Sequence, residues 1–391
     1  MEAIYLDHAA TTPVHPAVLE AMLPYLRDVY GNPSSVHAAG RVARAAVDDA
    51  RDALAGALQC AAREVLFTGS GTEADNLALR GTLQRYAGER GRHLVVSAIE
   101  HDAVLDTARR LEATGAASLT VVGCDAGCRV DPEEVAAAVR PDTVCVSVML
   151  VNNETGTVQD IAATAELVHR RNPRTLVHTD AAQAVGRVRV VPDELGVDLV
   201  TVVGHKIYAP KGVGALWVRD GVFVATQMTG GGQERTRRSG TENVAGVVGL
   251  GAAARLAVQR GATEAPRQAA LCARLLASVT QRVPDAIVTG DPDHRAPGFA
   301  TVVVPGARTD VLLVALDSRG VQASGGSACS TGAPTPSHVL LAIGIAPELA
   351  ACALRCTTGI GTTEAAIDRA ADVIVAAVDQ VRRAPTVAIA G

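Results

Sequence analysis

Polar side chains able to do acid–base and covalent chemistry follow four apolar runs of this sequence. The runs are HLVVSAIEH, TVCVSVMLVNN, TLVHTD and DLVTVVGHK. The side chains at or just after their ends are His101, Asn153, Asp180, Gln183, His205 and Lys206. One polar residue after a strand is usually a turn or cap residue, but four such ends favour a shared role. In open α/β sheets ligands bind beyond the carboxyl ends of the strands, so the pattern predicts one active site there.

Lysine is nearly absent from the chain. Only two of the 36 basic residues are lysines, Lys206 and Lys211. Where arginine serves for charge, a retained lysine indicates a need for an amine that can lose its proton and act as a nucleophile. Lys211 lies in an Ala-Pro-Lys-Gly turn, where its side chain would be exposed, so we expect Lys206 to be the reactive amine.

Two glycine-rich segments are candidate anion sites. In TGSGTEADN, Gly71 and Thr72 open an expected helix, whose first N–H groups and dipole attract a phosphate. The alternative is a simple glycine-rich turn, since no P-loop or dinucleotide fingerprint is present. The segment GGGQERTRRSGT, residues 230–241, is either a second anion contact or a solvated basic loop.

A lysine, a carboxylate, an imidazole and an anion-binding turn at one edge are the groups that pyridoxal phosphate requires. The lysine forms a Schiff base, and a carboxylate facing the pyridine nitrogen keeps it protonated, so that the ring acts as an electron sink. An imidazole near the ring can stack on it and move protons. We therefore predict pyridoxal 5′-phosphate as cofactor, with Asp180 and Lys206 carried by adjacent strands.

Cys329 differs from the other seven cysteines. It lies in SGGSACSTGAPTPSH, residues 324–338, which is rich in Gly, Ser, Ala and Pro and has no apolar anchor. Such a loop suits an accessible thiol that approaches a bound substrate and then carries something away; an incidental exposed cysteine is the alternative. Cys124 and Cys128 have no His or second Cys pair at zinc-like spacing, so no metal site is predicted.

Alternating strand and helix patterns predict a largely parallel α/β sheet that positions these groups. The expected strands are 64–68, 93–98, 143–151, 175–179, 199–203 and 214–218, with later ones at 300–304 and around 321. The expected helices are 36–58, 74–86, 103–114, 161–171 and 241–258.

Length and composition limit the class of protein. A chain of 391 residues with 48% hydrophobic residues favours a large domain plus a smaller one. We place a boundary near residue 260, giving a large domain 13–260 and a small domain formed by 1–12 and 261–391.

A net charge of −5 without like-charge runs argues against nucleic-acid or membrane partners. The N-terminus lacks a signal-peptide pattern, so a cytoplasmic location is expected.

The sequence resembles the cysteine desulfurases of the NifS/IscS type, in the class V aminotransferase superfamily. The matching segments run in order along nearly the whole chain: YLDHAATTPVHP, GNPSSVH, FTGSGTEADNLALRG, EHDAVLDTARRLE, VNNETGTVQDI, HTDAAQAVG, GHKIYAPKGVGAL, GGGQERTRRSGTEN, SGGSACSTG and LRCTTG. The resemblance implies the fold of type I pyridoxal-phosphate transferases. That fold has a large domain, with a mostly parallel seven-stranded sheet between helices, and a smaller α+β domain.

The resemblance also implies roles for individual residues. Lys206 would bind the cofactor covalently, Asp180 would face its pyridine nitrogen and His101 would stack on its ring. The remaining cofactor contacts would be Gly71, Thr72, Asn153, Gln183, His205 and, from the other subunit of a homodimer, Thr241. Arg355, with Asn153, would bind the substrate carboxylate, a bidentate task suited to guanidinium.

The implied activity is removal of sulfur from L-cysteine, giving L-alanine and a persulfide on Cys329. A sulfur acceptor, such as an iron–sulfur scaffold or a thiolation enzyme, would receive the sulfur, and Cys329 is a possible transient cluster ligand. A selenocysteine lyase or another class V enzyme is the alternative within enzymes; a catalytically idle scaffold that binds a sulfur carrier fits least. Many relatives have serine where this chain has Val203. The resemblance therefore implies that one hydrogen bond to the cofactor phosphate is missing here, which would weaken cofactor binding by roughly 0.5–1.5 kcal/mol.

Overall fold

The computed structural model describes residues 3–326 and 336–383. Its largest element is a seven-stranded sheet in the order β2-β8-β7-β6-β5-β3-β4. β8 runs antiparallel to both of its neighbours, and the other neighbouring strands are parallel. The strands are β2 (Val65–Thr68), β3 (His93–Ser97), β4 (Ser118–Val122), β5 (Thr143–Ser147), β6 (Leu176–Asp180), β7 (Leu199–Val203) and β8 (Gly214–Val218). The mostly parallel α/β fold class predicted from the sequence is confirmed.

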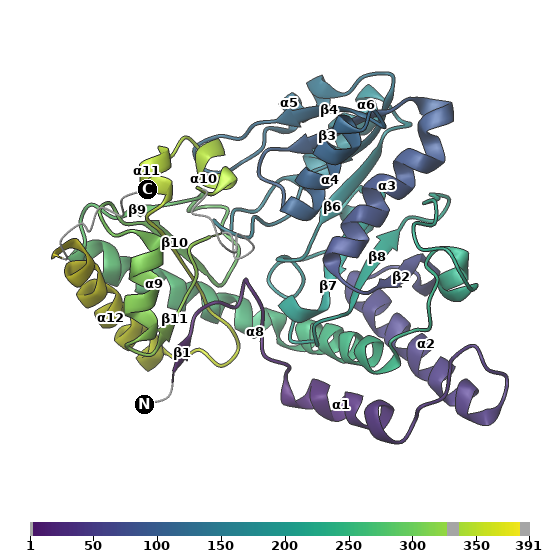
Figure 1. Ribbon diagram of the computed structural model, residues 1–391, viewed down its shortest axis with the longest axis horizontal. Helices are drawn as coiled ribbons and strands as arrows, with labels where there is room; N and C mark the ends of the chain where they lie inside the picture. The colour runs from purple at the N-terminus through teal and green to yellow at the C-terminus, as the bar shows by residue number, and fades with distance from the viewer. Residues whose placement is uncertain (1–2, 327–335, 384–391) are drawn as a thin grey trace.

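Helices cover both faces of this sheet (Figure 1). Strand residues alternate between the faces: Leu94 and Val96 pack with α3 and α4, whereas Val95 packs with α2, α6 and α8. Both faces are therefore apolar, which explains the continuous apolar runs in the sequence. The helices are α1 (Pro16–Arg27), α2 (Ala38–Leu58), α3 (Gly71–Arg90), α4 (Asp102–Ala113), α5 (Pro132–Ala138), α6 (Ile161–Arg171), α7 (Pro192–Leu195) and α8 (Val244–Arg282).

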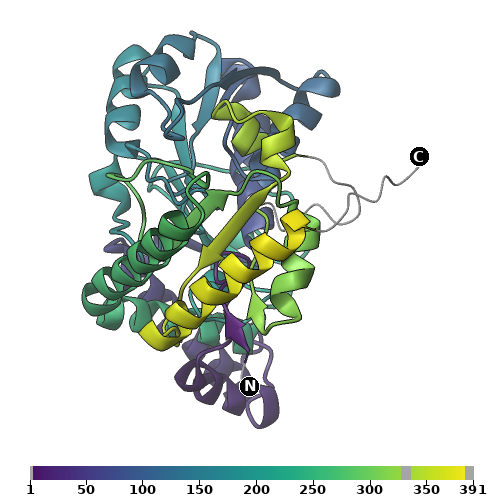
Figure 2. The same ribbon diagram turned by 90° about the vertical axis from the view of Figure 1, so that its left-hand side faces the viewer.

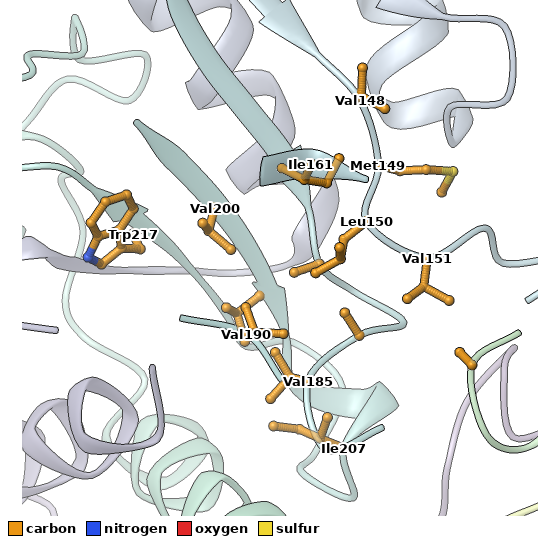
Figure 3. Packing of buried hydrophobic residues seen from close by; sticks show 14 of the residues in the cluster. Val148, Met149, Leu150, Val151, Ile161, Val185, Val190, Val200, Ile207 and Trp217 are labelled. Atoms are coloured by element: carbon orange, nitrogen blue, oxygen red, sulfur yellow. The ribbon is translucent and has the colours of Figure 1, made fainter. Parts of the chain in front are cut away.

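Aliphatic side chains and a single tryptophan fill the core beneath the central strands. Figure 3 shows Trp217 of β8 and Val200 of β7, which are direct partners in the strand register. The run Val148–Val151 continues this core beyond the end of β5. We predicted a strand to residue 151, but β5 ends at Ser147. Residues 148–151 are instead a buried apolar loop at the edge of the sheet where the sequence predicts the active site.

The helix α8 crosses residue 260, where we expected a helical stretch to stop. It runs for 39 residues, through Gly261 and Pro266. Its first half buries residues to Ala254 against the large core, and from Leu271 onward it packs against a second core. The middle turns bridge the two cores and bury little, so the apolar periodicity that marks a helix is interrupted there. Figure 1 shows α8 passing along both parts of the molecule.

The C-terminal part holds a second, smaller core. Its antiparallel sheet has the order β12-β10-β9, and β11 pairs in parallel with the N-terminal β1. Figure 2 shows β1 beside the C-terminal elements, and Ile4 and Leu6 belong to their core. The elements are β1 (Ile4–Tyr5), β9 (Ile287–Val288), β10 (Phe299–Val303), α9 (Thr309–Asp317), β11 (Val321–Gln322), α10 (His338–Ala342), α11 (Pro347–Ala350), β12 (Ala353–Thr357) and α12 (Glu364–Arg383).

The two separate cores agree with the division into domains 13–260 and 1–12 plus 261–391, which stays a prediction. Among the residues described, no helix is both long and apolar enough to cross a bilayer.

Candidate active site

A cavity of about 240 Å³ lies beyond the carboxyl ends of the central strands. Nine of the residues singled out from the sequence line it together: Gly71, Thr72, His101, Asn153, Asp180, Gln183, His205, Lys206 and Arg355. Thr241 is exposed and does not line it; its predicted reach is toward another subunit. Cys329 lies outside the described residues. The strand-end pattern therefore converges in space, with Arg355 added from the C-terminal part.

The two lysines lie in different places. Lys206 ends a short 3-10 turn directly after β7, and its Nζ donates to the carbonyl oxygens of Ala9 (2.5 Å) and Ala10 (2.7 Å). Lys211 is exposed and lines a separate cavity near the N-terminus. Only Lys206 can present an amine to the cavity at the strand ends.

Asp180 is a buried carboxylate whose charge needs a partner. It is the last residue of β6, only 4% exposed, and its Oδ1 accepts a hydrogen bond from the Ala182 N–H at 2.8 Å. Burial raises the pKa of Asp180, while His101 and Lys206 act in the opposite direction. A cation in the cavity would therefore stabilise the ionised form of Asp180 strongly.

His101 caps the helix that follows β3. Its Nδ1 accepts a hydrogen bond from the Ala103 N–H at 3.0 Å, so the neutral ring carries its proton on Nε2. A cap of this kind fixes both the ring orientation and the tautomer. His101 can thus offer a ring face and an N–H donor to a group in the cavity.

The start of α3 provides the anion-binding end of the cavity. Ser70 caps the helix by accepting from the Glu73 N–H at 3.1 Å, and Gly71 and Thr72 follow in the first turn, where N–H groups have no partner within the helix. His205 lines the same cavity, with Nδ1 3.1 Å from Thr11 Oγ1. Burial and the two lysines lower the pKa of His205 to about 4, so it is neutral near pH 7.

The basic loop, residues 230–241, contacts this helix start through an ion pair with its first turn. Arg238 pairs with Glu73 at 2.7 Å, and Glu73 also accepts from the Gly69 N–H at 2.8 Å. No arginine of this loop lines the cavity. Within this chain the loop therefore supports the glycine turn rather than contributing a direct anion contact.

Arg355 is a fully buried guanidinium held in place by two oxygen atoms. It lies on β12 and is 1% exposed; Nη2 donates to Asp7 Oδ1 at 3.0 Å and Nη1 to the Asn153 carbonyl at 2.8 Å. Its Nε–H has no hydrogen-bond partner among the residues that the structure describes. Because a buried unpaired donor is costly, this arrangement suits an additional anionic oxygen, such as a substrate carboxylate.

Several residues of the site were not among those predicted, and four of them are charged or titratable side chains with a clear position. Asp75, Glu154 and His338 line the cavity, and Asp7 holds Arg355. Asp75 could have been found, since it lies four residues after Gly71 and so on the same helix face. Burial and the neighbouring Asp180 raise the pKa of Asp75. Glu154 directly follows Asn153 and shares its strand-end signal, whereas Asp7 and His338 reach the site from segments distant in the sequence and carry no local signal.

The fold and this cavity define a type I pyridoxal-phosphate enzyme. The chain belongs to the aminotransferase class-V family, whose model matches residues 4–370. It is 42% identical over 385 residues to a cysteine desulfurase of Cereibacter sphaeroides, covering 98% of this chain and 97% of that protein. A solved NifS-like protein has a TM-score of 0.90 at 32% identity, covering 97% of this chain and 100% of that one. For SspA in complex with cysteine the TM-score is 0.79 at 33% identity, with coverage of 90% and 98%.

The cofactor of this family is pyridoxal 5′-phosphate, and the residues of the cavity fit it. Gln183 is 3% exposed, and its Nε2 donates to the Ala9 carbonyl at 2.8 Å. Its buried Oε1 has no hydrogen-bond partner in the described ranges, residues 3–326 and 336–383. The buried Asp180 calls for a cation, the protonated pyridine nitrogen, and the start of α3 calls for an anion, the phosphate. The cavity thus offers an acceptor for the pyridine nitrogen at one end and N–H donors for the phosphate at the other.

Proposed function

We propose that this protein is a cysteine desulfurase that converts L-cysteine to L-alanine and passes the sulfur through a persulfide on Cys329 to an acceptor. The observation that carries the proposal is the meeting of Lys206, Asp180, His101 and Arg355 in one cavity. The family and its cysteine desulfurase members support the same activity.

The sheet side of the cavity binds and activates the cofactor. When bound, pyridoxal 5′-phosphate supplies an electron sink for the bonds of the substrate. Lys206 contributes the amine that holds it covalently, and ionised Asp180 stabilises the proton on its pyridine nitrogen. The first turn of α3, with Gly71 and Thr72, binds the phosphate. His205 adds a neutral imidazole beside them.

The remaining polar groups of the cavity orient the ring and the substrate. His101 would offer its imidazole face to the ring, with the proton on Nε2 because Nδ1 accepts from the Ala103 N–H. Gln183 and Asn153 contact the ring substituents. Arg355 binds the substrate carboxylate, and the hydrogen bonds of its Nη groups to Asp7 and to the Asn153 carbonyl hold the guanidinium in place.

The sulfur-transfer step balances without an external oxidant. The Cys329 thiolate attacks the sulfur of L-cysteine, a sulfur–sulfur bond forms and the carbon–sulfur bond breaks. The electron pair of the broken carbon–sulfur bond stays with the carbon skeleton, which takes up a proton and leaves as L-alanine. One L-cysteine and one thiol thus give one L-alanine and one persulfide, and a thiol of the acceptor then takes the outer sulfur.

The proposal includes partners. A homodimer would bring Thr241 of each chain to the other chain's phosphate site, which agrees with its exposure and its distance from this chain's own cavity lining. The acceptor is a sulfur-carrier protein of an iron–sulfur or thiolation pathway, and a cytoplasmic location belongs to the same proposal. Nucleic acid and membrane are not expected as direct partners.

The test is the stoichiometry of the products. Purified protein with bound cofactor, L-cysteine and a thiol reductant should release L-alanine and sulfide in equal amounts. Cys329→Ala should keep the cofactor absorbance but lose the sulfide. Cofactor-loaded protein that acts on L-selenocysteine and not on L-cysteine would replace the proposal with a selenocysteine lyase. Full desulfuration by Cys329→Ala would assign the transfer to another thiol.

A further inference from the structure

Glu154 has no role in the chemistry proposed above, although it lines the same cavity. Its side chain is 1% exposed. A buried carboxylate is costly unless other groups satisfy it, so its contacts indicate what it does. It belongs to the loop that follows β5 and immediately follows Asn153 in the chain.

The backbone around Glu154 is fixed from two directions. The Asn152 side-chain Oδ1 accepts from the N–H groups of Glu154 (3.0 Å) and Thr155 (2.9 Å), and its Nδ2 donates to the Ile99 carbonyl at 3.1 Å. Thr301 of β10 donates from Oγ1 to the Glu154 carbonyl at 2.6 Å. The carboxylate therefore projects from a rigid base connected to both sheets.

The Glu154 carboxylate contacts two points that lie eleven positions apart in the sequence. Ser337 donates from Oγ to Glu154 Oε2 at 2.6 Å. Gly326 approaches the same oxygen so closely that a Cβ there would lie 2.7 Å from it, and its φ of +111° also favours glycine. Residues 326 and 337 flank the segment that contains Cys329.

Neighbouring contacts fix both points further. On one side, Ser324 exchanges backbone hydrogen bonds with Arg355 at 3.1 and 2.7 Å. On the other side, His338 Nε2 donates to the Glu100 carbonyl at 2.9 Å. The two ends of the segment are thus tied to the substrate-binding arginine and to the turn that carries His101, with Glu154 between them.

We propose that Glu154 is a positioning residue for sulfur transfer: its carboxylate, through Gly326 and Ser337, holds the two ends of the Cys329 segment at the cavity. This inference rests on the proposed function. Within the described part of the chain, Glu154 makes no hydrogen bond to the residues proposed to hold the cofactor or the substrate carboxylate, and it interacts with Arg355 through charge alone. Glu154→Ala and Glu154→Gln both remove that charge, so slower transfer in Glu154→Ala that Glu154→Gln restores reports the position of the segment and not the charge beside Arg355. A displacement of about 1 Å in a reacting group can cost on the order of 10²-fold in rate.

The experiment separates binding from transfer in holoenzyme. The change in cofactor absorbance after mixing with L-cysteine reports substrate binding, and the mass gain of one sulfur on Cys329 in a single turnover reports transfer. Glu154→Ala should slow the mass gain by about tenfold to 100-fold while the absorbance change keeps the wild-type dependence on L-cysteine concentration. Glu154→Gln should recover most of the rate, because its amide carbonyl still accepts from Ser337. Glu134→Ala, which removes an exposed glutamate, is the matched control and should match the wild type.

Ser337→Ala provides a second route if Glu154→Ala does not fold. Ser337→Ala removes the hydrogen bond to Glu154 and also the cap of α10, where Ser337 Oγ accepts from the Leu340 N–H at 3.2 Å. It should slow persulfide formation at least as much as Glu154→Ala, and the double variant should be no slower than Ser337→Ala, since the bond to Glu154 is already lost there. Wild-type persulfide formation in Glu154→Ala or in Ser337→Ala would overturn the inference. Equal slowing of the absorbance change and the mass gain would also overturn it, since Glu154 would then act on the whole site. Wild-type protein that yields no L-alanine would contradict the proposed function instead.

Discussion

The cavity has two walls that are built differently. Asp180 and Lys206 stand at or just beyond the ends of β6 and β7, which have strand neighbours on both sides within the seven-stranded sheet. Arg355 comes from β12, an edge strand of the small sheet, and Gly326 and Ser337 come from the loops beside it. One wall is a continuous hydrogen-bonded structure, and the other is assembled from segments distant in the sequence.

This difference matches a division of labour. The groups that hold the cofactor need fixed geometry, which the ends of parallel strands provide. Arg355, the group proposed to recognise the substrate, belongs to the second wall, as do Gly326 and Ser337, which Glu154 is proposed to position. Changes on the sheet wall should therefore act on the cofactor, and changes on the second wall should act on substrate and transfer.

The largest effect is expected at Lys206. Lys206→Ala removes the only amine of the cavity lining, so cofactor retention should fail and L-alanine release should fall by at least about 10³-fold. The visible absorbance of the purified protein and the rate of L-alanine release measure both effects. Lys211→Ala should leave both at wild-type values, because Lys211 is exposed on a different cavity. The reverse result would mean that the reactive lysine is Lys211.

On the second wall, Arg355→Ala should weaken the use of substrate and spare the cofactor. Loss of a hydrogen-bonded carboxylate partner should lower kcat/KM by roughly tenfold to 200-fold, mainly through KM, with unchanged cofactor absorbance. Arg355→Lys keeps the charge but not the forked geometry, so it should recover only part of the loss. An unchanged KM in both variants, or loss of cofactor, would place Arg355 with the sheet wall.

The sequence revealed the sheet wall better than the second wall, for a physical reason. His101, Asn153, Asp180 and Lys206 follow strands, and strand ends in a parallel sheet must meet at one edge. The helical pattern of the sequence also predicted both ends of the helix Ile161–Arg171 correctly. Glu154 directly follows Asn153, so the same rule could have found it, whereas the place of His338 depends on how the C-terminal core docks. Arg355 was found only through the family resemblance.

Buried polar groups of the sheet wall should give stability a pH dependence. His178 of β6 is fully buried between Ser147 Oγ (2.8 Å) and Thr201 Oγ1 (3.1 Å), and burial lowers its pKa to about 3. The unfolded chain takes up the proton near pH 6.5, but the folded protein does not. The stability contributed by the neutral ring is therefore complete above pH 6.5 and declines as the pH falls, by roughly 1 kcal/mol per pH unit.

The variant His178→Asn lacks this proton uptake. Its free energy of unfolding, measured by denaturant titration between pH 7 and pH 5, should fall less steeply than that of the wild type. The difference between the two proteins should thus shrink as the pH decreases. Parallel curves over this range would show that His178 gains its proton in the folded state as readily as in the unfolded chain.

The smallest effect is expected at Val203, the last residue of β7, which lies on the sheet wall beside the proposed phosphate site. Val203 is 6% exposed, and its Cγ2 lies only 2.3 Å from where a Cβ on Gly71 would stand. The valine thus fills the space beside the first turn of α3 without offering a donor. Val203→Ser should add a hydroxyl hydrogen bond to phosphate worth about 0.5–1.5 kcal/mol, a roughly two- to tenfold tighter cofactor.

Val203→Ala separates this hydrogen bond from packing, because it removes the same methyl groups without adding a hydroxyl. The cofactor dissociation constant, measured by titrating apoprotein, should be lower for Val203→Ser than for Val203→Ala, with kcat nearly equal in the two variants. Equal constants would show that phosphate is already satisfied by the N–H groups of α3 and by Thr72. A change in kcat with no change in affinity would contradict the separation of walls, since a residue at the phosphate end would then influence sulfur transfer.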